Sequence, residues 1–168
     1  ANGTTIQTTN AGTSAISIAA GGTGNAAIAA LQTGAAGRTT ISAGGAITDN
    51  NVGSTNITGG NAALSAATGI GSGNALETTI SNLAFSNTTS GNVQVTNTGG
   101  LTIASIGSIA TSSNVGTSTT TLTASSPVTF AVNTASGGDL TANATESAAA
   151  NDNITVNAGV TVQSTAGD

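Results

Sequence analysis

Residues 91–103 read GNVQVTNTGGLTI and contain the pattern on which the fold prediction rests. Val93, Val95, Leu101 and Ile103 alternate with polar residues, and the turn-forming residues NTGG separate the two alternating arms. Successive side chains of a strand point to opposite faces, so each triplet places two apolar groups on one face and one polar group on the other. The stretch therefore predicts two short strands joined by a tight corner.

The same unit recurs along the chain. Residues 154–162, ITVNAGVTV, repeat the design around the turn NAG. The apolar residues that lead the units lie on average about 23 residues apart, within the range of periods that indicates a solenoid or a repeat array. These residues are Ile16, Ile41, Leu64, Val93, Leu122, Leu140 and Ile154.

Strands this short cannot form a wide sandwich, but they can coil around a narrow core of Val, Ile, Leu and Ala. In a β-solenoid each strand pairs with its counterpart about 4.8 Å along the axis, and Asn and Thr at the corners form ladders between coils. We therefore expect an all-β fold, a β-solenoid with short strands and Gly, Asn and Thr corners. Residues 1–168 are expected to form one such domain of about seven to eight coils.

Three alternatives compete with the solenoid. Turn signals at intervals of about 8 to 12 residues also fit a β-sandwich. The bias towards Gly, Ser, Thr and Asn also fits a disordered linker, although a linker has no reason to keep β-branched residues at period two. Those four residue types are unfavourable inside helices, so residues 25–37, NAAIAALQTGAAG, are the one segment compatible with a short helical turn.

The composition excludes most catalytic chemistry. The chain has no His and no Cys, and its only base is Arg38. A Ser/His or Cys/His nucleophile pair, a Schiff base, a thiolate or imidazole zinc site and a haem ligand cannot be built from this inventory. We therefore expect no enzyme activity, no catalytic residue and no cofactor.

The acidic residues are scattered along the sequence. They are Asp49, Glu77, Asp139, Glu146, Asp152 and Asp168. Glu146 and Asp152 are the pair that could approach each other across one corner, as a glycosidase requires. Two Phe residues are too few to make a cleft for a sugar ring, so we interpret these carboxylates as solvated corner residues.

The charge balance limits the partners. A chain with a net charge of −5 and a single base cannot neutralise a row of phosphates or hold an anionic membrane surface. No apolar run approaches the roughly 18 residues of a membrane span. We expect neither nucleic-acid binding nor membrane insertion.

Two short clusters, TDNN and NDN, contain the oxygen ligands that calcium prefers. The candidate ligands are Asp49, Asn51, Asn151 and Asp152, with Asn50 and Asn153 beside them. The nonapeptide calcium pattern is not matched, because residues 137–140, GGDL, have their Asp in the wrong place. Asn and Asp are also the ordinary residues of tight turns, and turn chemistry is the favoured interpretation.

Two further patterns are weak. The sequons at Asn56, Asn87, Asn143 and Asn153 match N-x-[ST], but a chain so rich in Asn and Thr contains such matches by chance. The run Thr117–Thr123, TSTTTLT, raises the possibility of a water-ordering face like that of ice-binding β-helices. That function needs Thr in register on consecutive coils, whereas the Thr positions shift between the sequence units.

Residues 71–103, 122–130 and 137–168 resemble the β-strand repeat regions of filamentous-haemagglutinin-like adhesins, a group of very large bacterial secreted proteins. The likeness covers about residues 64–168 well and the first third only in style. It implies a right-handed parallel β-helix, export to the cell surface, and a role in adhesion, biofilm or surface coating. It carries no catalytic motif, and the unequal repeat lengths depart from the most regular members.

Two classes of function follow. The first is a structural or adhesive extracellular module of a bacterial surface protein or filament, a rigid rod coated with hydroxyl groups. The alternative is a binding module for glycan, calcium or ice on the same scaffold. Neither end of the sequence carries a Lys or Pro that would block edge pairing, so we expect a segment or subunit of a longer fibre. The expected partners are copies of the chain or neighbouring repeats end to end, and host or matrix glycans.

Overall fold

The computed structural model describes residues 5–10, 15–146 and 152–166. These residues form nineteen strands and no helix. The strands are β1 (Thr5–Gln7), β2 (Ile16–Ala20), β3 (Ala26–Ile28), β4 (Ala30–Gln32), β5 (Arg38–Ala43), β6 (Ile47–Asp49), β7 (Ile57–Thr58), β8 (Asn61–Ala66), β9 (Leu76–Thr79), β10 (Asn82–Asn87), β11 (Val93–Asn97), β12 (Leu101–Ile103), β13 (Ser112–Asn114), β14 (Thr120–Ala124), β15 (Val128–Phe130), β16 (Thr134–Ser136), β17 (Leu140–Ala144), β18 (Ile154–Val156) and β19 (Val162–Ser164).

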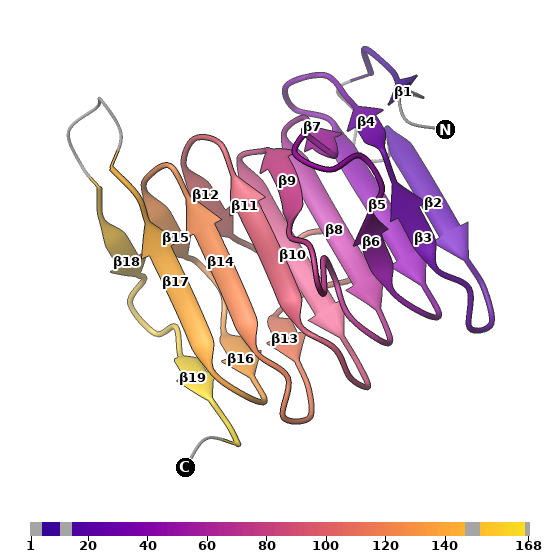
Figure 1. The fold of residues 1–168 in the computed structure, drawn as a ribbon. Helices are drawn as coiled ribbons and strands as arrows, with labels where there is room; N and C mark the ends of the chain where they lie inside the picture. Colours follow the sequence, from indigo (N-terminus) through magenta and orange to yellow (C-terminus); the bar gives the residue numbers. More distant parts are fainter. Residues whose placement is uncertain (1–4, 11–14, 147–151, 167–168) are drawn as a thin grey trace.

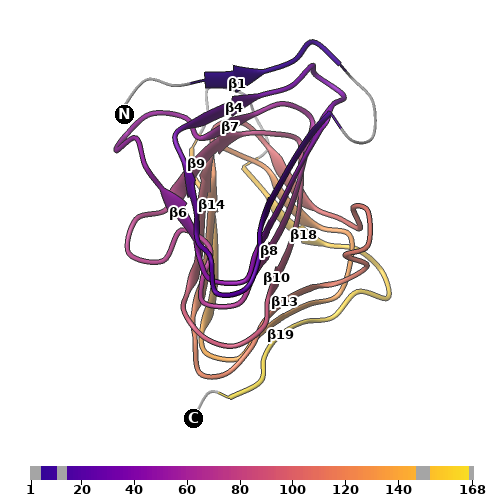
Figure 2. The ribbon, with the colours of Figure 1, turned by 90° about the vertical axis from the view of Figure 1, so that its right-hand side faces the viewer.

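The strands stack as a parallel β-solenoid, which confirms the predicted fold class. One sheet has the order β1-β4-β7-β9-β11-β14-β17, and β3 pairs with β6. The other sheet runs β2-β5-β8-β10 and then divides, because β10 pairs with both β12 and β13, which continue as β12-β15-β18 and β13-β16-β19. The coils follow one another from β1 and β2 at one end to β18 and β19 at the other (Figure 1). Seen along the axis, successive coils overlay around a narrow interior (Figure 2).

The solenoid has about six turns, so the expected number of seven to eight coils was too high. Leu140 and Ile154 lead separate units in the sequence but belong to one coil, since β17 pairs with β14 while β18 pairs with β15 of the preceding coil. Coil lengths are also uneven: Ile80 bonds to Asn97, 17 residues away, whereas coil-to-coil contacts elsewhere span 28 residues. An average period therefore does not give the coil count.

Residues 25–37 form strands β3 and β4, so the expected helical turn is wrong. Burial alternates along β3, with Ala26 and Ile28 inside and Ala27 exposed. β3 pairs with β6, and β4 with β1 and β7. Alanine is a good helix former, but the neighbouring coils supply backbone partners and a place to bury every second residue, and this tertiary pairing overrides the propensity.

The core is a set of apolar columns that run along the axis. Ile41, Leu64 and Phe85 are paired in register on β5, β8 and β10, and none of them is exposed. Leu101 stacks on Val128 and Ile103 on Phe130 in the second half of the chain. Each such side chain gains about 1.5–3 kcal/mol from burial, so a thin interior of aliphatic residues and two Phe rings is sufficient to hold the coils together.

Asparagine ladders form at the corners, as expected from the sequence. Asn82 donates a 3.0 Å hydrogen bond from Nδ2 to Oδ1 of Asn61 in the preceding coil, and Asn87 donates a 2.7 Å bond to Oδ1 of Asn114 in the following coil. Asn87 and Asn114 are buried. Their amides also bond to corner backbone, so each ladder joins two coils and closes the turn beside it.

The same logic predicts a large cost for removing the buried amide of Asn97. Its Oδ1 accepts bonds from the Ile80 N–H (3.0 Å) and the Thr78 hydroxyl (2.8 Å), and its Nδ2 donates to the carbonyls of Ile80 and Gly99 (both 3.1 Å). Because Asn97→Ala leaves these groups buried without partners, we expect the free energy of unfolding in urea to fall by about 2–4 kcal/mol.

Asn143→Ala is the matched control. Asn143 is exposed and makes one long bond of 3.4 Å to Thr123, so its loss should change the stability by less than about 0.5 kcal/mol. Equal losses in the two variants would contradict the structural role of the buried asparagine.

Candidate binding sites

Residues 104–111 leave the coil between β12 and β13 and lie on the outer face of β8 and β10. Ile106 packs against Ala63 and Ala84 and is only 7% exposed. The segment folds back on itself through reciprocal backbone bonds of 3.1 Å between Ile106 and Ile109. Small outward side chains at 63 and 84 leave room for this contact, so the segment is held against the sheet by apolar packing.

A groove of about 580 Å³ runs between this segment and the outer face of the sheet. Its lining includes Ser42, Ser65, Ser86 and Ser113. These four residues are paired in register from β5 to β13, so their hydroxyls form one column along the solenoid axis. Adjacent strands lie about 4.8 Å apart, which sets the spacing of the hydroxyl groups.

Arg38, the chain's only base, also lines this groove. It is half-buried at the start of β5, and Thr40 and Ser42 follow it on the same outer face. A Cβ placed on Gly107 would lie 3.2 Å from Nη1 of Arg38, so the backbone of the outward segment comes close to the guanidinium. The hydroxyl of Thr40 is buried and has no hydrogen-bond partner in the protein.

The sequence analysis missed this groove. Arg38 entered it only as a count of positive charge. The available signal was local: Ile106 and Ile109 are two large apolar residues in a Ser- and Gly-containing stretch directly after a strand triplet. That pattern indicates a loop with an apolar anchor, but the surface on which it docks lies more than a full coil away in the chain.

Asp49, a candidate calcium ligand, organises the loop that follows β6. Oδ1 accepts hydrogen bonds from the Asn51 backbone (2.8 Å) and the Asn56 side chain (2.6 Å), and Oδ2 accepts bonds from the Val52 backbone (3.2 Å) and the Asn74 side chain. Both carboxylate oxygens are therefore used by N–H donors. A calcium ion could bind Asp49 only if some of these donors moved away.

The other calcium candidates are not gathered around Asp49. Asn51 is close to it, but its Nδ2 donates to the Ala29 carbonyl. Asp152 is exposed on the last coil, and Asn151 lies outside the described residues. The described part of the chain contains no group of three or more His, Cys, Asp or Glu side chains placed to hold a metal ion. Calcium binding stays a prediction.

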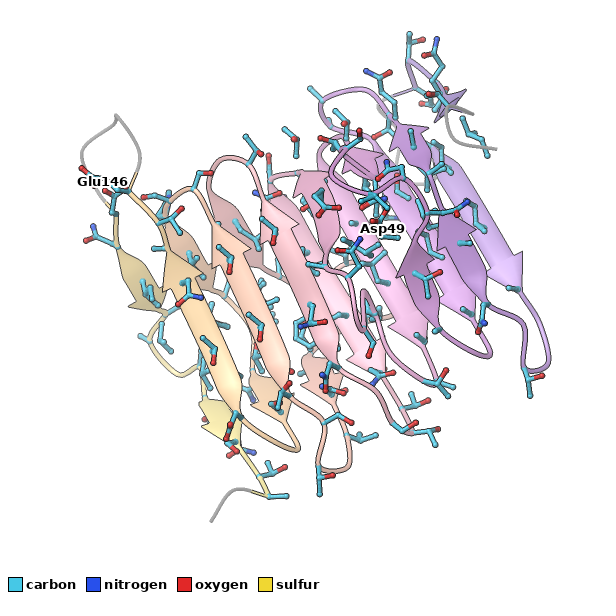
Figure 3. All side chains as sticks on the ribbon, in the orientation of Figure 1. Asp49 and Glu146 are labelled. Atoms are coloured by element: carbon cyan, nitrogen blue, oxygen red, sulfur yellow. The ribbon has the colours of Figure 1, made fainter. Side chains whose placement is uncertain are left out.

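The remaining carboxylates are dispersed. Asp49 lies in the N-terminal half, whereas Glu146 lies near the opposite end (Figure 3). Asp139, Glu146 and Asp152 are exposed, Glu77 is half-buried, and Asp168 lies outside the described residues. The described residues form no helix long and apolar enough to cross a membrane.

Threonine is in register on two outer faces, which corrects the interpretation that its positions shift between coils. Thr102, Thr129 and Thr155 form one column on β12, β15 and β18. Two further columns run along β11, β14 and β17, and they are Gln94-Thr121-Thr141 and Thr96-Thr123-Asn143. The unequal coil lengths hide this alignment in the sequence.

The sequons divide into two groups. Asn56 and Asn87 are buried, and their side chains bond to the backbone or to other asparagines, so they are not glycan acceptors in the folded protein. Asn143 and Asn153 are exposed.

Comparisons with known proteins give no relative. No family model, no curated protein and no solved structure matches the chain. The likeness to filamentous-haemagglutinin-like repeats therefore rests on the repeat pattern, with which the β-solenoid is compatible.

The bonding of Asp49 gives a second prediction. Asp49→Asn replaces one acceptor oxygen with an NH2 group that faces N–H donors, so we expect the free energy of unfolding to fall by about 1–3 kcal/mol. The exposed Asp139→Asn is the matched control and should have a small effect. Both are measured by urea unfolding, and equal effects would contradict the role assigned to Asp49.

Thermal melts of the same two proteins test calcium. A site at Asp49 would raise the melting temperature of the unmodified protein with millimolar calcium, and Asp49→Asn would abolish the rise. Identical melts in calcium and in chelator would reject the site.

Proposed function

We propose that the chain is a structural and adhesive module of an extracellular bacterial surface protein or filament, without catalytic activity or cofactor. The observation that carries this proposal is the continuous parallel stack of coils with hydroxyl columns on its outer faces. Backbone bonds along the axis resist bending and extension because every interior strand is paired on both sides.

The composition of the outer faces supports a scaffold. Charged residues make up 4% of the chain, whereas about 25% is typical. Thr, Ser, Asn and Gln side chains take their place on β11, β14 and β17. Hydroxyl and amide groups keep the rod hydrated without a strong field, which suits a surface coat or a spacer more than a partner for polyanions.

The last coil supports end-to-end continuation. Ile154 and Val156 are 51% and 48% exposed, whereas Val128 and Phe130, their paired residues in the preceding coil, are at most 1% exposed. At the other end Ile6 is 52% exposed. A further coil on these ends, from a neighbouring repeat or from another copy, would cover the apolar groups and pair the free strand edges.

Sedimentation velocity and electron microscopy test this proposal. We expect the isolated chain to associate into longer rods as its concentration rises from micromolar to millimolar. Ile154→Lys with Val156→Lys should abolish association, because lysines at a strand edge block pairing. Val115→Lys, at a 37% exposed residue away from β18, is the control and should leave association unchanged. A monomer at all concentrations would reject stacking of copies.

The groove beside Arg38 favours the second candidate function, a binding module on the same scaffold. A rod that carries a site for matrix glycans would act as an adhesin, and many weak sites along one fibre would give high avidity.

A further inference from the structure

We propose that the groove between residues 104–111 and the serine column binds a carboxylate-bearing oligosaccharide, a chain of sugars that includes uronic acid units. The inference deepens the binding function proposed above and does not depend on the rod's end-to-end assembly. Three features of the groove lead to it: its charge, its row of hydroxyl groups and its lack of an aromatic surface.

The charge selects an anion. Arg38 is the only positive side chain in a chain of net charge −5, and it lies in the groove. A guanidinium presents a planar set of donors that matches a carboxylate and forms charge-assisted hydrogen bonds. The six acidic residues of the chain repel a dense polyanion. A ligand with sparse carboxylates therefore fits better than nucleic acid or a heavily sulfated polymer.

The serine column selects a polyhydroxylated chain. Each hydroxyl of Ser42, Ser65, Ser86 and Ser113 can both donate and accept a hydrogen bond, as can each hydroxyl of a sugar. The column extends along the solenoid axis, so it suits a linear ligand that lies parallel to the rod. The buried hydroxyl of Thr40 adds a polar group without a protein partner beside Arg38.

An extended peptide fits the groove less well. The strands beneath the groove already pair with neighbours on both sides, so a peptide would gain no ladder of backbone bonds there. A neutral glycan also fits less well, because both Phe residues are buried and no aromatic ring is available for stacking. The carboxylate bond to Arg38 must therefore supply most of the selectivity.

Isothermal titration with three probes tests the proposal. The probes are an oligogalacturonate, the same oligosaccharide with its carboxyl groups reduced to alcohols, and dextran sulfate. We expect the oligogalacturonate to bind at least about tenfold more tightly than either of the others, since the charge-assisted bond is present only there. Added salt should reduce this preference. No binding of the oligogalacturonate, or equal affinity for all three probes, would overturn the proposal.

Variants locate the site. Arg38→Gln should remove the preference for the carboxylated probe, while Arg38→Lys should keep part of it because the charge remains. Ser65→Ala with Ser86→Ala should weaken both oligosaccharides. Thr121→Val, on the distant face of β14, is the control and should change neither affinity. A preference that survives Arg38→Gln would place the site elsewhere and reject the proposal.

Assembly provides the independent readout. Arg38→Gln should leave the sedimentation behaviour and the strand circular dichroism spectrum unchanged, so a loss of binding is distinguishable from a failure of the rod proposal. If Arg38→Gln also unfolds, the salt dependence measured on the unmodified protein and the Ser65/Ser86 double variant decide the question.

Discussion

Parallel hydrogen bonding between successive coils is the constraint on which the rest of the structure depends. Strands that pair in this way lie about 4.8 Å apart, so each side chain stands directly over its equivalent in the next coil. An inward polar group would be buried against its neighbours and would need a partner there. The chain meets this demand with columns: Ile41, Leu64 and Phe85 stack inside, Ser42 and Ser65 stack outside, and buried asparagines bond along the corners.

Extra residues must leave the coil at its corners, because an insertion within an interior strand would break pairing on both of its edges. Two such places are visible. Asp49 gathers the loop after β6 with four hydrogen bonds, and Ile106 anchors residues 104–111 on the outside of the sheet. The outward segment also creates the one feature of the described surface that combines positive charge with ordered hydroxyl groups. Function therefore concentrates where the repeat is irregular.

Local patterns predicted the strands well. β11 and β12 cover the alternating residues of 91–103, since alternation at period two is recorded in neighbouring residues. The prediction was wrong for residues 25–37, where alanine is compatible with helix and strand and only the adjacent coils select the strand. It also missed the Thr102, Thr129 and Thr155 column, because coils of different length shift the sequence spacing between residues that stack in space.

The sequence by itself determined an all-β chain of short strands, a thin aliphatic core, corners rich in Asn and Gly, and an inventory without the groups used in most nucleophilic and metal catalysis. Only the tertiary structure decided which residue stacks on which. Register is the accumulated result of how many residues each corner absorbs, and no local pattern contains that sum. This is why Arg38 and Gly107, far apart in the chain, share one groove, and why four serines from four strands form a single column beside them.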